Sequence, residues 1–122
     1  MAASLTHLIS DAGQGYPMLD RLEKLLESGQ DSPMLRLSLG QGYLKEGRHE
    51  EAVDHLRQAL KLQQDYSAAW KALGQALAAA GDPDGARAVY DDGIRIARDK
   101  GDLQAAKEME VFRKRLDKQS PG

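Results

Sequence analysis

The apolar residues of this chain recur every three or four positions, which is the spacing of one face of an α-helix. No stretch alternates apolar and polar residues as a half-buried β-strand does, and valine, isoleucine and threonine are few. Helices are predicted over about residues 32–46 and 49–62, and two more follow. The apolar positions that mark the four helices are Leu35, Leu39, Tyr43 and Leu44; Ala52, Val53, Leu56, Ala59, Leu60 and Leu62; Ala69, Trp70, Leu73, Ala76, Leu77 and Ala80; and Ala86, Val89, Tyr90, Ile94 and Ile96.

Residues that begin and end helices stand between these segments. Ser32-Pro33 and Asp82-Pro83 each offer a capping side chain followed by proline at the first helical position, where the missing amide proton has no helical partner to lose. Each pair of helices is therefore predicted to form a hairpin with a very short turn. The glycines that fall where helices should stop and the backbone needs a left-handed residue are Gly29, Gly47, Gly81 and Gly101.

The chain also repeats itself with a fixed period. Leu39-Gly40-Gln41 returns 34 residues later as Leu73-Gly74-Gln75, and Ala52 returns as Ala86. A period of this length is typical of a solenoid, in which each hairpin buries its apolar face against its neighbours. A solenoid of this kind favours a binding module over a catalytic one.

The repeated residues resemble the tetratricopeptide repeat. Trp70-x-x-Leu73-Gly74-x-x-Leu77 followed by Ala86-x-x-x-Tyr90 is similar to its pattern, and the preceding unit matches with Leu39-Gly40-x-x-Tyr43 and Ala52-x-x-x-Leu56. The resemblance implies an all-α fold, a right-handed superhelical stack of antiparallel helical hairpins. Three features depart from the pattern: Arg36 replaces the tryptophan of the first unit, Gln64 and Arg98 replace the terminal proline, and Gly93 replaces alanine. The missing proline predicts a slightly longer fourth helix.

The repeat divides the chain into predicted parts. Residues 1–16 are expected to be an N-terminal tail or a frayed first helix, which would use Leu5, Leu8 and Ile9. Residues 17–118 are expected to form one domain, with a loose C-terminus at 119–122. Its predicted segments are a degenerate half-repeat (17–31), two repeats (32–65 and 66–100) and a capping helix (102–118).

Composition narrows the range of functions. The 122 residues suit one domain, and the formal net charge of −2 gives no concentrated positive charge for nucleic acid. The chain contains no cysteine, which excludes disulfides and thiolate metal sites. No apolar run approaches the roughly 20 residues that span a bilayer. We therefore expect a cytoplasmic protein that binds neither nucleic acid nor membrane.

No constellation of residues indicates catalysis. Glu51 and His55 are four residues apart and could share a metal, but a surface pair is the simpler interpretation. Adjacent carboxylates such as those of Asp91 and Asp92 diverge by about 100° on a helix. We expect no catalytic residues, no metal and no cofactor. At its repeat position, Trp70 is expected to pack in the interior.

The resemblance implies that the first helix of each hairpin lines a concave groove, which in similar proteins holds a peptide or a partner helix. The leading hypothesis is an adapter that binds a segment of another protein there. The alternative is a structural module that self-associates, as a weak homodimer or part of a longer array. Of the Lys, Asn and Arg set that clamps C-terminal carboxylates in this family, only Lys71 matches. The predicted groove residues are Met34, Leu37, Gln41, Leu44, Lys45, Ala68, Lys71, Gln75, Ala78 and Ala79.

Overall fold

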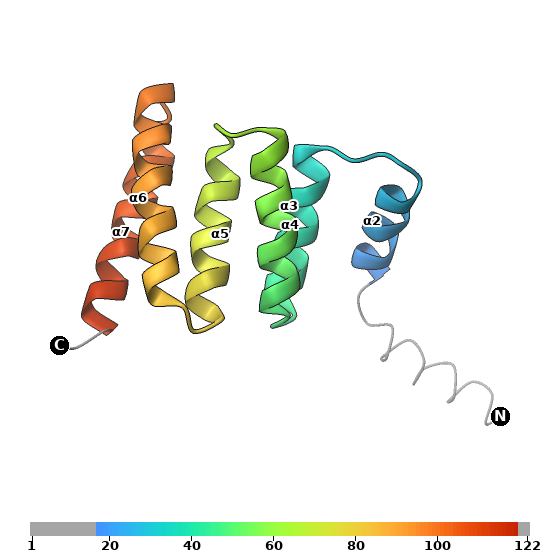
Figure 1. Ribbon diagram of the computed structural model, residues 1–122, viewed down its shortest axis with the longest axis horizontal. Helices are drawn as coiled ribbons and strands as arrows, with labels where there is room; N and C mark the ends of the chain where they lie inside the picture. Colours follow the sequence, from blue (N-terminus) through green and yellow to red (C-terminus); the bar gives the residue numbers. More distant parts are fainter. Residues whose placement is uncertain (1–16, 120–122) are drawn as a thin grey trace.

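The computed structural model describes residues 17–119, and all regular structure in that range is helical. The helices stand side by side from α2 at one end to α7 at the other (Figure 1). The predicted all-α solenoid is confirmed. The helices are α2 (Pro17–Glu27), α3 (Pro33–Lys45), α4 (His49–Leu62), α5 (Ser67–Ala79), α6 (Pro83–Lys100) and α7 (Leu103–Gln119).

The helix ends use the residues that the sequence indicated. The Ser32 hydroxyl accepts a hydrogen bond of 3.0 Å from the amide of Leu35, and the Asp82 carboxylate accepts one of 2.9 Å from the amide of Gly85. These bonds satisfy amides that have no partner within the helix. The glycines that follow α2, α3, α5 and α6 all adopt positive φ, between 78° and 90°.

The core is built where small and large residues meet across each hairpin. Gly40 of α3 lies against the side chain of Leu56, and Gly74 of α5 lies against the ring of Tyr90. Leu56 and Tyr90 are almost completely buried. Because a glycine lets the two helix axes approach, the large partner can fill the layer between them. In both hairpins a glycine of the first helix thus faces a large side chain of the second helix at the same repeat position.

The two hairpins differ in the length of their second helices. α5 begins 34 residues after α3 and has the same 13 residues, whereas α4 has 14 residues and α6 has 18. α4 ends at Leu62 although it too lacks the terminal proline, whereas α6 continues to Lys100, whose ammonium donates a 3.0 Å hydrogen bond to the carbonyl of Asp65. α7 then begins at Leu103 after a tight turn through Gly101. The lengthening expected for the fourth helix is observed.

Trp70 packs against the core but is only partly buried. Its indole nitrogen donates a 2.7 Å hydrogen bond to the carbonyl of Gln64, which lies in the connection between α4 and α5. A Cβ atom at position 93 would lie 2.8 Å from Cβ of Trp70 and 2.7 Å from the sulfur of Met109, which explains why Gly93 stands there. The expectation of an interior tryptophan is therefore met only in part, since Trp70 packs against the core without being fully buried.

α7 covers the end of the second hairpin. Met109 of α7 is fully buried, and Arg113 pairs with Asp91 of α6 at 2.5 Å. Arg87 of α6 reaches Asp117 of α7 at 3.1 Å. The charged outer side of α7 keeps this end of the array polar, as a capping helix does. The predicted tail, residues 1–16, and residues 120–122 lie outside the described residues, and the domain boundaries stay predictions.

Candidate protein-interaction surface

The first helices of successive hairpins are neighbours. α3 packs beside α5, and α5 packs beside α7, so α7 takes the place of a further first helix. We call the exposed side chains of α3 and α5 along this row the first-helix surface. The predicted groove residues fall into three classes of burial: Met34, Gln41, Lys45 and Ala79 are exposed; Leu44, Ala68, Lys71, Gln75 and Ala78 are half-buried; and Leu37 is buried.

Leu37 is the predicted groove residue that the structure moves into the core. Its side chain is 9 % exposed and belongs to the hydrophobic core cluster. In the repeat it corresponds to Lys71 of α5, which carries a charge at its tip and stays half-buried. An apolar side chain at this position sinks between the helices where a lysine cannot, because burying an ammonium is costly. Leu37 therefore does not line the first-helix surface.

Lys71 is held by the capping helix. Its ammonium donates a 2.8 Å hydrogen bond to the Glu108 carboxylate of α7, and the side-chain amide of Gln104 donates to the other oxygen at 3.1 Å. These bonds, with the Lys71 charge, lower the pKa of Glu108 below its ordinary value of 4.5. The pair is not apparent from the sequence, because its members are 37 positions apart. Lys71 consequently has less freedom to meet a ligand than Lys45 has.

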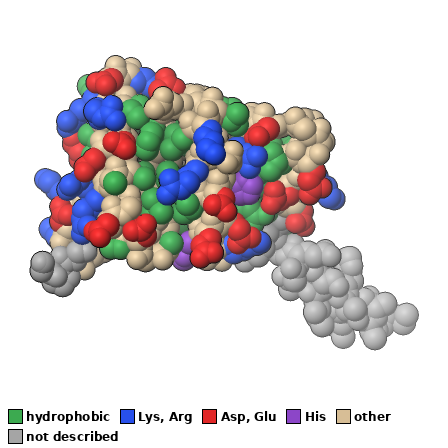
Figure 2. All heavy atoms as spheres, viewed as in Figure 1, with side chains coloured by type: hydrophobic (Ala, Val, Ile, Leu, Met, Phe, Trp, Pro, Cys, Tyr) green, Lys and Arg blue, Asp and Glu red, His purple; other side chains and the backbone are tan. Residues whose placement is uncertain are grey.

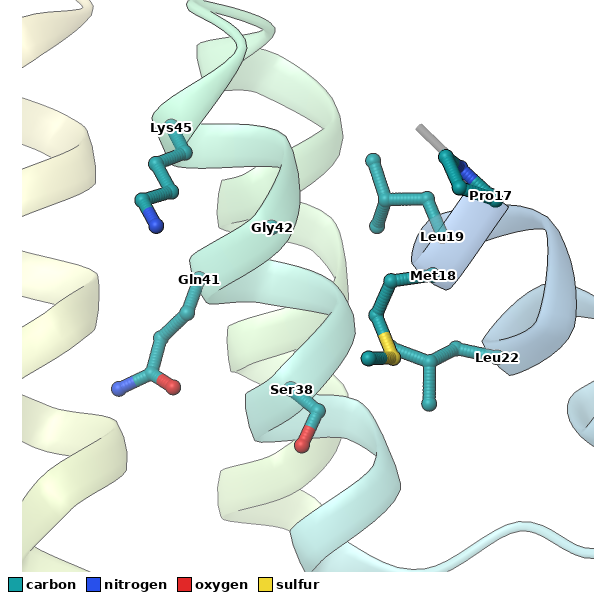
Figure 3. Close-up of a pocket in the computed structure, with 8 residues that line it drawn as sticks. All are labelled: Pro17, Met18, Leu19, Leu22, Ser38, Gln41, Gly42 and Lys45. Atoms are coloured by element: carbon teal, nitrogen blue, oxygen red, sulfur yellow. The ribbon is translucent and has the colours of Figure 1, made fainter. Parts of the chain in front are cut away.

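A cleft opens between α2 and α3 beside this surface. It encloses about 830 Å³, and Met18, Leu19 and Leu22 point from α2 toward α3 (Figure 3). Gly42 provides the closest approach of α3, because a Cβ atom there would lie 2.5 Å from Cδ2 of Leu19. Gln41 and Lys45 extend along the other edge of α3. The residues that line this α2–α3 cleft are Pro17, Met18, Leu19, Leu22, Ser38, Gln41, Gly42 and Lys45.

A polar cluster fastens α2 to α3 and α4. The Tyr43 hydroxyl donates to the Glu23 carboxylate, and the imidazole of His55 stacks on the Tyr43 ring at 5.4 Å between centroids. Burial, helped by Glu23, raises the pKa of Tyr43 to about 12. Arg36 stands 3.0 Å from Nδ1 of His55 and also binds Asp31, so the position that holds tryptophan in the second unit serves this cluster. These contacts hold α2 against the first hairpin.

Burial lowers the pKa of His55 below its ordinary value of 6.5, and the neighbouring Arg36 charge acts in the same direction. Glu51, the other half of the metal pair considered from the sequence, is bound instead by Arg48. Within residues 17–119, no group of three histidine, aspartate or glutamate side chains is arranged to hold a metal ion. In the same range no helix combines the length and apolar character needed to cross a membrane. On the face drawn in Figure 2, basic and acidic side chains are interspersed, with hydrophobic ones between them.

Comparison with known proteins matches the tetratricopeptide repeat to residues 43–109 and, separately, to residues 19–62. The chain belongs to the tetratricopeptide repeat family. A TPR repeat-containing protein of Pseudomonas aeruginosa is 46 % identical over 101 residues, which cover 83 % of this chain and 96 % of that protein. Another, from Dictyostelium discoideum, is 36 % identical over 81 residues, covering 66 % of this chain and 30 % of that protein. Tetratricopeptide repeats are in general protein–protein interaction modules rather than enzymes.

Solved structures of the tetratricopeptide fold agree with the arrangement of the helices. A solution structure of a protein from Bordetella parapertussis superposes with a TM-score of 0.75 at 40 % identity, covering 83 % of this chain and 88 % of that one. The TPR domain of Sgt2 from Aspergillus fumigatus superposes with a TM-score of 0.67 over 93 % of this chain and 79 % of that one. At 21 % identity the second likeness concerns the fold alone.

Proposed function

We propose that this tetratricopeptide repeat protein is an adapter that binds an extended segment of another protein along its first-helix surface. The observation that carries the proposal is the exposure of Gln41 and Lys45 on α3, beside the half-exposed Gln75 and Ala78 on α5. A lysine at the rim can attract a carboxylate, and glutamine amides can bond a peptide backbone. The chemistry favours a segment that carries acidic side chains.

The adjacent α2–α3 cleft supports the proposal, because it offers apolar surface next to these polar groups. Ligand sites commonly combine an apolar hollow with a few polar groups that fix orientation. Gln41 and Lys45 line both the cleft and the first-helix surface, so a bound segment can contact both. With two complete hairpins the buried area is small, and we expect a dissociation constant in about the micromolar range.

The test is to select peptides from a random display library on the immobilised chain and titrate them into the isotope-labelled protein. We expect amide shifts within residues 34–45 and 68–79, and a binding preference for acidic peptides. Lys45→Glu should weaken binding about tenfold, since it reverses the charge at the rim. Lys61→Glu makes the same change on an exposed position of α4 and should leave binding unaltered. Shifts confined to other helices, or equal effects of the two variants, would reject the proposal.

Self-association is a second candidate, and one observation favours it. Met18 and Leu25 of α2 are 64 % and 41 % exposed, which is unusual for large apolar side chains on one short helix. Sedimentation velocity over a range of concentrations tests this candidate. A sedimentation coefficient that stays at the monomer value at the highest concentration excludes it.

A further inference from the structure

α2 exposes positions that the complete hairpins bury. The second helices of the complete hairpins have three inward positions each, and all six residues there are buried. They are Ala52, Leu56 and Ala59 in α4, and Ala86, Tyr90 and Gly93 in α6. The 34-residue offset places Met18, Leu22 and Leu25 on the same positions of α2. Met18 is 64 % exposed, Leu25 is 41 % exposed, and Leu22 is half-buried. α2 is therefore a second helix whose hairpin partner is absent from the described residues.

The missing partner has a defined place. A first helix contacts the second helix of its own hairpin and the next first helix, as α5 contacts α6 and α7. For α2 this place lies along α2 and α3, where the α2–α3 cleft of about 830 Å³ opens. Figure 3 shows Met18 and Leu22 directed into that space. An occupant must present an apolar face and carry little charge on it, because buried unpaired charge is costly.

The sequence of residues 1–12 meets both conditions. The inward positions of the first helices are Leu35, Leu39 and Tyr43 in α3, and Ala69, Leu73 and Leu77 in α5, and all are buried. Stepping back by 34 residues gives Met1, Leu5 and Ile9, which are all apolar. The segment contains no lysine or arginine and a single carboxylate, that of Asp11. Gly13 then falls on the turn glycine Gly47, so the connection to α2 has the length of a hairpin turn.

We infer that residues 1–12 of this same chain dock on α2 and α3 as the first helix of an N-terminal hairpin, with Leu5 and Ile9 covering Met18 and Leu22. Thr6 then stands where the other hairpins have Gly40 and Gly74. Because Thr6 faces Leu22 where Gly40 faces the equivalent Leu56, the two helices of this hairpin lie farther apart at that point than α3 and α4 do. The docked segment adds one more first helix to the row. A docked N-terminal segment fills the apolar part of the α2–α3 cleft, so an external partner then binds along the first-helix surface without that apolar contact.

The experiment uses a spin label on the full chain. Because the protein has no cysteine, His7→Cys gives a single attachment site. Position 7 corresponds to the exposed Gln41, so the label points away from the docked face. The chain that carries both the spin label and the isotope label is diluted with protein that carries neither, so that only effects within one molecule are observed. In this sample we expect the amide signals of Leu22 and Gly42 to lose most of their intensity. Signals of the distant α6 should keep theirs.

Leu5→Glu combined with Ile9→Glu places two charges on the docked face and should restore the lost intensity. In the chain without a spin label, the same double variant should speed hydrogen exchange in α2 about tenfold. Asp11→Lys is the control, since position 11 corresponds to Lys45 and Ala79, which are both exposed, and the variant changes charge away from the docked face. A second sample mixes chains that carry only the isotope label with chains that carry only the spin label. If the amide signals of Leu22 and Gly42 broaden only in this mixture, a second copy of the chain supplies the segment. That result, or no broadening at all, overturns the inference.

Discussion

At Gly40 and Gly74 the helices of each hairpin leave no room for a side chain. A Cβ atom at Gly40 would lie 2.5 Å from Cγ of Leu56, and one at Gly74 would overlap the ring of Tyr90. Leu56 can adjust to an added methyl group by changing rotamer, whereas the buried ring of Tyr90 is rigid and has little room to move. The same substitution in the two hairpins should therefore have different costs.

Gly74→Ala is expected to destabilise the fold by about 1–2 kcal/mol. Overpacking costs about 1–3 kcal/mol, and alanine recovers up to about 1 kcal/mol through its higher helix propensity. Gly40→Ala should cost less, since Leu56 can shift. Urea denaturation of both variants measures the difference, and Tyr90→Leu combined with Gly74→Ala should recover part of the loss. An increase in the urea midpoint for Gly74→Ala would contradict the close contact.

His55 makes the stability of the fold sensitive to pH. Burial holds its folded-state pKa below 6.5, so the folded protein binds fewer protons at this site than the unfolded chain does. The contribution of His55 is complete above pH 6.5 and is lost as the pH falls from 6.5 through the lower folded-state pKa. The melting temperature should fall as the pH is lowered below 6.5, and His55→Gln should flatten the curve there. An NMR titration midpoint above 6.5 for His55 would reverse the expected sign.

At the level of single residues, the sequence predicted what depends on neighbours within one hairpin. The turn glycines, the two caps and the pairs Gly40–Leu56 and Gly74–Tyr90 lie at fixed offsets, so periodicity reveals them. The salt bridge between Lys71 and Glu108 and the burial of Leu37 depend on how one first helix meets the next. Those contacts change whenever the neighbouring residue changes, and a repeat pattern does not encode them.

Among the elements, α7 has one side buried against the second hairpin and one side exposed to solvent, and the packing of α7 depends on the buried side. Met109 is fully buried, whereas Val111 is 47 % exposed two positions along. Met109→Ala should cost about 2–5 kcal/mol, because it leaves a cavity beside Gly93 and Trp70. Val111→Ala on the same helix should change stability by less than about 0.5 kcal/mol. Thermal melts of the two variants make the comparison, and similar losses would mean that α7 does not pack as described.

Element lengths show a second limit of prediction from sequence. Gly101 marked the end of α6 in the sequence, but the missing proline did not distinguish α6 from α4, which lacks it too and ends at Leu62. The α2–α3 cleft was not predicted. Repeat position assigns residues to helices, but it does not give the space that is left between α2 and α3. Periodicity gives the order and spacing of helices, and the surfaces between them follow from three-dimensional contacts.

Across the whole molecule, the helices differ in how many neighbours support them. α5 packs against α3, α4, α6 and α7, whereas α2 packs along α3 and reaches α4 through Glu23 and His55. Local opening requires less free energy where fewer contacts are broken. Amide hydrogen exchange should therefore be slowest in α5 and fastest, among the six described helices, in α2. Uniform exchange rates along the array would instead indicate that it opens as a single cooperative unit.

The position of the single tryptophan gives the molecule a built-in optical reporter. Trp70 belongs to α5, its nitrogen binds Gln64 at the end of the first hairpin, and its Cβ lies against Gly93 of α6. Rearrangement of the connection between α4 and α5 is expected to break that hydrogen bond and expose the indole to water. Its ultraviolet emission therefore reports on this central part of the array without an added dye, and should respond little to fraying of α2 or of the end of α7.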